Sequence, residues 1–142
     1  MNATHDLHIA SLTPLPSPVR LRDDLPMTEA QENAVTAARA DVEAVLRGDD
    51  DRLLVVVGPC SVHDPLAAVD YARRLAQVAE KHRDDLLVVM RVYFEKPRST
   101  GGWKGLINDP ALDGTHDVAR GVHTARRLLL DVIDIGLPVG CE

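Results

Sequence analysis

Aromatic residues, cysteines and long apolar runs are all scarce in this chain of 142 residues. Only 3% of the residues are aromatic, so a core has to be built from the Val, Leu and Ala within the 45% apolar fraction. The two cysteines, Cys60 and Cys141, lie too far apart for a CxxC zinc motif and give no disulfide framework. The length and apolar content suit one globular domain.

A surplus of positive charge and a membrane-spanning segment are also missing. The formal net charge is −6, which argues against a surface for nucleic acid or anionic membranes, because such surfaces need clustered cations. No apolar stretch approaches the about 20 residues that cross a bilayer. The start MNATHDLHIA lacks the basic residues and apolar core of a secretion signal. We therefore expect a cytoplasmic protein that binds neither nucleic acid nor membrane.

Prolines and helix-capping residues divide the first third of the chain. Residues 1–27 contain four prolines and no helical apolar stripe, so we expect an extended arm rather than a core element. A disordered terminus is the alternative. Thr28 and Gln31 have the spacing of a capping box, which predicts a leading helix over residues 28–48. Gly48 supplies a left-handed stop for this helix.

The rest of the chain, residues 49–142, alternates apolar runs with amphipathic helical patterns. The runs at 53–57 and 86–92 predict strands of a parallel sheet that is covered on both faces. Asp64 predicts the cap of the helix between them, and a further helix ends near Gly136 before a third strand. Such α/β alternation is found in doubly wound sheets and in (β/α)₈ TIM barrels. With three strands and two helices, either architecture is incomplete.

Polar side chains stand where these strands end. Cys60 follows the first strand, Arg91 ends the second and Glu142 follows the third. Because ligands of both architectures bind at the carboxyl ends of the strands, we expect these residues to share one site. The residues alone leave three roles open for Cys60, which could be a metal ligand, a nucleophile or an inert buried thiol.

A basic loop, RVYFEKPRSTGGWKG at residues 91–105, follows the second strand. Lys96, Arg98 and the hydroxyl of Ser99 can donate to carboxylate or phosphate, which predicts an anion-binding loop. A solvated basic loop is the alternative, and Trp103 could instead anchor an interface. The chain has no GxGxxG or GxxxxGK[ST] motif, so the residues do not support a nucleotide site.

Three segments resemble the first part of class I 3-deoxy-D-arabino-heptulosonate 7-phosphate synthase. They are DDRLLVVVGPCSVHDP (50–65), MRVYFEKPRSTGGWKGLINDP (90–110) and RRLLLDVIDIGLPVGCE (126–142). The resemblance implies the N-terminal part of a TIM barrel, preceded by the arm and the leading helix. It also implies a transferase of the shikimate pathway of aromatic amino acid biosynthesis. That family condenses phosphoenolpyruvate with erythrose 4-phosphate and releases phosphate.

The resemblance implies roles for single residues. Cys60 is similar to the family's thiolate ligand of a divalent metal, of the Mn, Fe, Co or Zn type. Arg91 resembles a phosphoenolpyruvate-binding cation, and Lys96 resembles a catalytic residue shared between the two substrates. Arg98 and Ser99 resemble the clamp for the phosphate of erythrose 4-phosphate.

Further features of the family bear on both ends of the chain. Glu142 resembles an acid close to the phosphate of phosphoenolpyruvate. The arm resembles a segment that crosses a dimer interface and contributes to an aromatic amino-acid feedback site. Residues 6–9 would contact this site. The resemblance therefore implies a homo-oligomer. The family's other metal ligands follow later strands. The resemblance therefore implies that this chain by itself is an inactive fragment that binds no metal.

Two other functions stay open. The chain could be a non-catalytic module, arm plus partial barrel, that associates with a full-length subunit. It could also belong to a related synthase that joins phosphoenolpyruvate to a different sugar phosphate. The KPRS sequence at residues 96–99 favours the four-carbon aldose.

Overall fold

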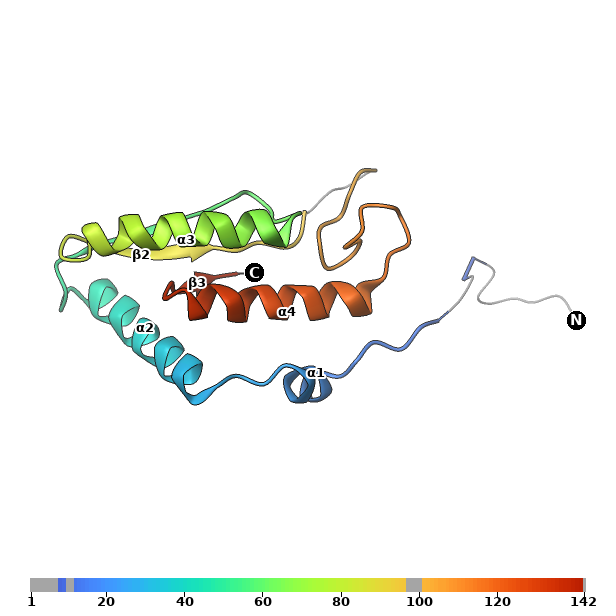
Figure 1. Ribbon diagram of the computed structural model, residues 1–142, viewed down its shortest axis with the longest axis horizontal. Coiled ribbons are helices and arrows are strands. Elements are labelled where there is room, and N and C mark those ends of the chain that lie inside the picture. The colour runs from blue at the N-terminus through green and yellow to red at the C-terminus, as the bar shows by residue number, and fades with distance from the viewer. Residues whose placement is uncertain (1–7, 10–11, 97–100, 142) are drawn as a thin grey trace, which may run out of the picture.

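The computed structural model describes residues 8–9, 12–96 and 101–141. Within them the elements follow in the order α1, α2, β1, α3, β2, α4 and β3 (Figure 1). The strands form one parallel sheet in the order β1-β2-β3, so their carboxyl ends share an edge. The predicted alternation of strands and helices is confirmed. Arg98, Ser99 and Glu142 lie outside the described residues, as does most of the segment 1–11.

A short helix, α1 (Pro18–Asp24), interrupts the segment that we expected to be an extended arm. That expectation was wrong for these residues, because Ser17 caps the helix and a proline at its first position is already set for helical φ. No residue of α1 is buried. Leu25 follows it and is buried, and its carbonyl accepts a bond of 2.7 Å from Arg126 Nε. This bond ties the segment to α4 (Val118–Asp134).

The leading helix is α2 (Glu29–Arg47), and its predicted signals are confirmed. Thr28 Oγ1 accepts from the amide of Gln31, whose side chain accepts in return from the amide of Thr28. Gly48 ends the helix at φ 80°, a conformation that costs glycine little. Gln31 is also buried, and its Nε2 donates to Asp134 Oδ1 at 2.8 Å. This bond joins the start of α2 to the end of α4.

The strands lie in register along β1 (Leu53–Val57) and β2 (Leu86–Arg91), where Val57 is level with Met90. Between them, α3 (Pro65–Lys81) begins at the predicted Asp64 cap, whose carboxylate accepts from two amides of the first turn. The third strand is short, β3 (Val139–Gly140), and its last residue is level with Arg91. The sheet therefore brings the residues after all three strands to one edge.

The core lies between the sheet and the pair α3 and α4. Met90 and Val92 are fully buried on this face, and they pack with residues of both helices. Ala72 of α3 and Ala125 of α4 belong to the same buried cluster, and such small side chains let the helices approach the strands closely. No helix in the described parts of the chain is long and apolar enough to cross a membrane.

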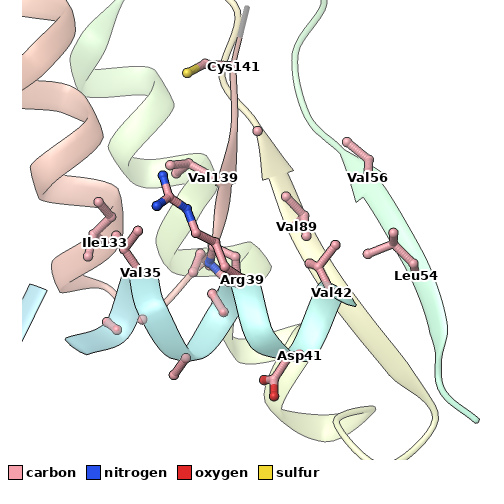
Figure 2. A pocket seen from close by; sticks show the side chains of 17 residues that line it. Val35, Arg39, Asp41, Val42, Leu54, Val56, Val89, Ile133, Val139 and Cys141 are labelled. Carbon is pink, nitrogen blue, oxygen red and sulfur yellow. The ribbon is translucent and has the colours of Figure 1, made fainter. Parts of the chain in front are cut away.

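The opposite face of the sheet looks toward α2 and is only partly covered. Successive side chains of a strand point to opposite faces, so Val89 points away from the core that holds Met90. An apolar cleft of about 660 Å³ lies between α2 and this face (Figure 2). Val56 lines the cleft and is 58% exposed. Among the described residues β1 is an edge strand and α2 covers this face only in part, so the prediction that the first strand is covered on both faces is wrong for them.

Candidate anion-binding site

The loop that carries Cys60 is held close to the end of β2. A side chain at Gly58 would overlap the carbonyl oxygen of Arg91, so only glycine lets the two backbones approach this closely. The amide of Val62 donates to the carbonyl of Tyr93 at 2.7 Å. Cys60 lies between these two points and its side chain is exposed. The backbone of β2 and the residues after it therefore sets the position of the thiol.

Arg91, at the end of β2, points across the same edge. One of its terminal nitrogens, Nη2, donates to the carbonyl of Cys60 at 3.3 Å. Its guanidinium carbon lies 4.0 Å from the centroid of the Tyr93 ring. The Nε atom is buried and has no hydrogen-bond partner among the described residues. Among the described residues, the guanidinium thus contacts the carbonyl and the thiol of Cys60 and the ring of Tyr93, and a guanidinium has five N–H donors in all.

A small hairpin holds Lys96 in place. The amide of Lys96 donates to Lys104 O at 2.9 Å, and the amide of Leu106 donates to Phe94 O at 2.7 Å. Gly105 forms an antiparallel bridge with Glu95. It adopts φ 119°, where a side chain would be strained and would overlap Phe94 O. These hydrogen bonds therefore join the two ends of the basic loop.

The segment after the hairpin is seated on α4. A side chain at Gly121 would overlap the carbonyl of Ile107, so the loop backbone touches the helix backbone there. The indole Nε1 of Trp103 donates to Asp109 O at 2.7 Å, and the buried Asp109 carboxylate accepts from the amide of Gly114. The indole N–H of Trp103 therefore has a partner within the chain. The interpretation of Trp103 as an interface anchor stays a prediction.

The side chains of Lys96 and Cys60 meet at this edge. Lys96 Nζ donates to Cys60 Sγ at 3.0 Å. This bond and the positive charge of Lys96 lower the pKa of the Cys60 thiol, and the charge of Arg91 acts in the same direction. The environment therefore favours the thiolate, which is the form that binds metals and reacts as a nucleophile.

The described residues alone do not make a metal site. A stable site takes about four ligands, and Cys60 is one soft donor. No three side chains of His, Cys, Asp or Glu come together in residues 8–9, 12–96 and 101–141. A metal bound to Cys60 would therefore need ligands from outside these residues.

The structure brings three of the predicted site residues together, and their roles stay predictions. Cys60, Arg91 and Lys96 come together at the carboxyl edge of the sheet. The roles predicted for Arg98, Ser99 and Glu142 stay predictions.

Sequence reasoning missed Tyr93 at this edge and Gly121 of α4, which contacts the segment after the hairpin. Tyr93 was read only as part of the loop, although its two-residue spacing from Arg91 places both side chains on one side of an extended chain. Gly121 carried no sequence signal that distinguishes it from an ordinary helix glycine. Its importance depends on a contact with Ile107, which no local pattern encodes.

Comparison with known proteins identifies the family. Residues 26–142 match the sequence profile of the DAHP synthetase I family. The chain belongs to this family. A phospho-2-dehydro-3-deoxyheptonate aldolase of Amycolatopsis methanolica is 60% identical over 131 residues, which are 92% of this chain and 64% of the relative. The Phe-sensitive aldolase of Escherichia coli is 53% identical over 137 residues, 96% of this chain and 39% of the relative.

A solved structure supports the same assignment. The structure of a phospho-2-dehydro-3-deoxyheptonate aldolase from Francisella tularensis superposes with a TM-score of 0.90 at 44% identity, over 94% of this chain and 39% of that chain. Relatives in the DAHP synthetase I family carry the names Trp-sensitive, in Enterobacter agglomerans, and Tyr-sensitive, in E. coli. The chain spans between 39% and 64% of the length of the two aldolases compared above.

Proposed function

We propose that this chain is the N-terminal part of a 3-deoxy-D-arabino-heptulosonate 7-phosphate synthase. This enzyme condenses phosphoenolpyruvate with erythrose 4-phosphate and releases phosphate, which is the first step of the shikimate pathway. The observation that supports the proposal most is the meeting of Cys60, Arg91 and Lys96 at one edge of a parallel sheet. Strands β1, β2 and β3 would be the first three of a (β/α)₈ barrel, in which ligands bind at this edge.

The proposal divides the chain into three parts. Residues 1–27 form an arm of the kind that takes part in subunit contacts and feedback, residues 28–48 form the leading helix, and residues 49–142 form the first part of the barrel. The bond between Arg126 and the Leu25 carbonyl supports a fixed attachment of the arm to the barrel part. The C-terminal end of the arm is thereby attached to α4.

The two substrates explain why an acidic chain gathers cations here. A new bond forms between the methylene carbon of phosphoenolpyruvate and the aldehyde carbon of erythrose 4-phosphate. Water then adds to the carbon that bears the phosphate, and phosphate leaves. Both substrates are anions and repel each other, so positive side chains have to offset the repulsion. Arg91 binds phosphoenolpyruvate, and Lys96, beside it, contacts both substrates.

The remaining predicted residues complete the proposed site. Arg98 and Ser99 hold the phosphate of erythrose 4-phosphate, and Glu142 lies near the phosphate of phosphoenolpyruvate. Cys60 supplies one thiolate ligand of a divalent metal, of the Mn, Fe, Co or Zn type, and the other ligands lie outside the described residues. The lowered pKa of Cys60 supports this role, because only the thiolate binds a metal.

The arm is the proposed place of regulation. Relatives named Phe-, Trp- and Tyr-sensitive suggest that an aromatic amino acid is the effector. We propose a homo-oligomer in which this effector binds near the arm. The exposed apolar side chains of Leu12 and Leu15 support a subunit contact there.

A chimaera tests the catalytic proposal. Residues 1–142 replace the matching part of the E. coli Phe-sensitive aldolase, and phosphate release is measured with phosphoenolpyruvate, erythrose 4-phosphate and manganese. We expect release that requires both substrates and is abolished by a chelator and by Cys60→Ser. Arg91→Gln should raise the KM for phosphoenolpyruvate, whereas Arg73→Gln, exposed on α3, should not. A folded chimaera that releases no phosphate would refute the proposal.

A second candidate function follows from the open cleft. The chain could act as a non-catalytic module that associates with a full-length subunit, which is favoured by the exposed Val56 and the apolar cleft under α2. Mixing the chain with the E. coli aldolase and measuring mass and feedback response tests this function. Absence of a complex at micromolar concentrations would exclude it.

A further inference from the structure

The ring of Tyr93 lies against the guanidinium of Arg91. The guanidinium carbon is 4.0 Å from the ring centroid, which is the geometry of a cation–π contact. Both side chains are half-buried, and they come from alternate positions of one extended segment. The contact is therefore built by the backbone itself rather than by a chance meeting of two long surface side chains.

Within the described residues, the other contacts of the guanidinium are with Cys60. Arg91 Nη2 donates to Cys60 O at 3.3 Å, a long hydrogen bond, and Nε has no partner among the described residues. An arginine side chain has many rotamers, and all but the one that binds are lost when an anion is bound. A flat ring on one side removes rotamers in advance and keeps water from that face of the cation.

The side chain of Tyr93 can be changed without changing its other contact. The carbonyl of Tyr93 accepts from the amide of Val62 at 2.7 Å, and this main-chain bond holds the loop that carries Cys60. Substitutions at Tyr93 keep that carbonyl. They therefore test the ring separately from the loop.

We propose that Tyr93 is a positioning residue, whose ring holds the Arg91 guanidinium in the orientation that binds the anionic substrate. The inference rests on the proposed function, because it takes phosphoenolpyruvate as the anion that Arg91 binds. Tyr93 acts through Arg91 and does not itself touch the substrate. Its loss weakens phosphoenolpyruvate binding and leaves erythrose 4-phosphate binding nearly unchanged.

The test measures phosphoenolpyruvate binding to the chimaera by calorimetry and steady-state kinetics. A cation–π contact of this kind predicts that Tyr93→Leu raises the Kd about 3- to 30-fold. Tyr93→Phe keeps the ring and should restore most of the affinity. The KM for erythrose 4-phosphate should change less than about twofold. An equal rise in the KM of both substrates would instead indicate general damage to the site. Tyr93→Met replaces Tyr93→Leu if the latter does not fold.

A double variant distinguishes the positioning role of Tyr93 from the substrate-binding role of Arg91. In the Arg91→Gln background, Tyr93→Leu should cause no further loss of phosphoenolpyruvate affinity, since the ring acts through the guanidinium. An equal loss in both backgrounds overturns the role of Tyr93, as does an equal loss for Tyr93→Phe and Tyr93→Leu. If Arg91→Gln leaves phosphoenolpyruvate binding unchanged, the proposed function of Arg91 fails instead. If Arg91→Gln weakens binding and Tyr93→Leu does not, the inference about Tyr93 alone is refuted.

Discussion

Lys96 Nζ lies 3.0 Å from Cys60 Sγ, although the two residues are 36 positions apart in the sequence. The loop after β1 supplies the thiol and the hairpin after β2 supplies the ammonium. Parallel strands bring these two segments to one edge, where the backbone contacts of Gly58 and Gly105 hold them close. The pair joins the proposed metal ligand to a proposed substrate cation, so changes at one residue should be detected at the other.

The first prediction concerns the pKa of Cys60. The pKa is lowered chiefly by the hydrogen bond and charge of Lys96, so the thiolate persists to lower pH than in a free cysteine. Lys96→Met should therefore move the midpoint of the iodoacetamide reaction rate to higher pH. The rate is measured with chelator present and in a Cys141→Ser background, in which Cys60 is the one remaining cysteine. The variant Lys81→Met, on α3, serves as the control and should leave the midpoint unchanged. If Lys96→Met has the same midpoint as the protein that keeps Lys96, the contact between Lys96 and Cys60 is contradicted.

The second prediction concerns Gly121. Alanine is the better helix former by about 0.5–1 kcal/mol, so propensity alone predicts a gain in stability from Gly121→Ala. The new methyl group would instead overlap the carbonyl of Ile107, and such overpacking costs about 1–3 kcal/mol. We expect a net loss in the free energy of unfolding in urea. Asn33→Ala, at an exposed position of α2, is the matched control and should be neutral or stabilising; a gain for both variants would disprove the close contact.

The third prediction concerns the link between α2 and α4. Gln31→Glu keeps the acceptor of the capping box but removes the donor to Asp134, and it places two carboxylates together. The loss of a bond to a charged group predicts a cost of about 1–3 kcal/mol in the free energy of unfolding. Adding Asp134→Asn should restore most of that stability, because an amide can donate to the new carboxylate. Without such recovery, the cost would have to come from the cap rather than from the link.

The fourth prediction concerns Arg98, which lies outside the described residues. If Arg98 holds the phosphate of erythrose 4-phosphate, Arg98→Ala in the chimaera should raise the KM for that substrate about tenfold or more. The KM for phosphoenolpyruvate should rise much less. Steady-state kinetics with each substrate varied in turn measures the difference. Equal losses for the two substrates would remove Arg98 from the clamp.

Much of the fold was predictable because local chemistry specifies it. The Thr28 and Gln31 box, the Asp64 cap and the left-handed Gly48 all appear where the residues predict them. Each signal satisfies backbone groups at a helix end, and those groups need a partner in any fold. The convergence of Cys60 and Arg91 was predictable for a related reason, since parallel strands place their carboxyl ends together.

The remainder depends on contacts that sequence patterns do not encode. A run of apolar residues does not show whether a strand is central or at an edge, so the exposure of Val56 was missed. Helix α1 was missed because four prolines in the arm outweighed the cap at Ser17. The contact of Tyr93 with Arg91 needs an extended chain beyond the end of β2, which becomes evident only in three dimensions.

A crystal structure of the chimaera with bound phosphoenolpyruvate tests the central claim most directly, namely that the edge holding Cys60, Arg91 and Lys96 binds this substrate. We predict that Arg91 and Lys96 both lie within hydrogen-bond distance of its carboxylate or phosphate oxygens, with the Tyr93 ring still against the guanidinium. Phosphoenolpyruvate bound at another place, or at this edge without contact to Arg91 and Lys96, would contradict the account.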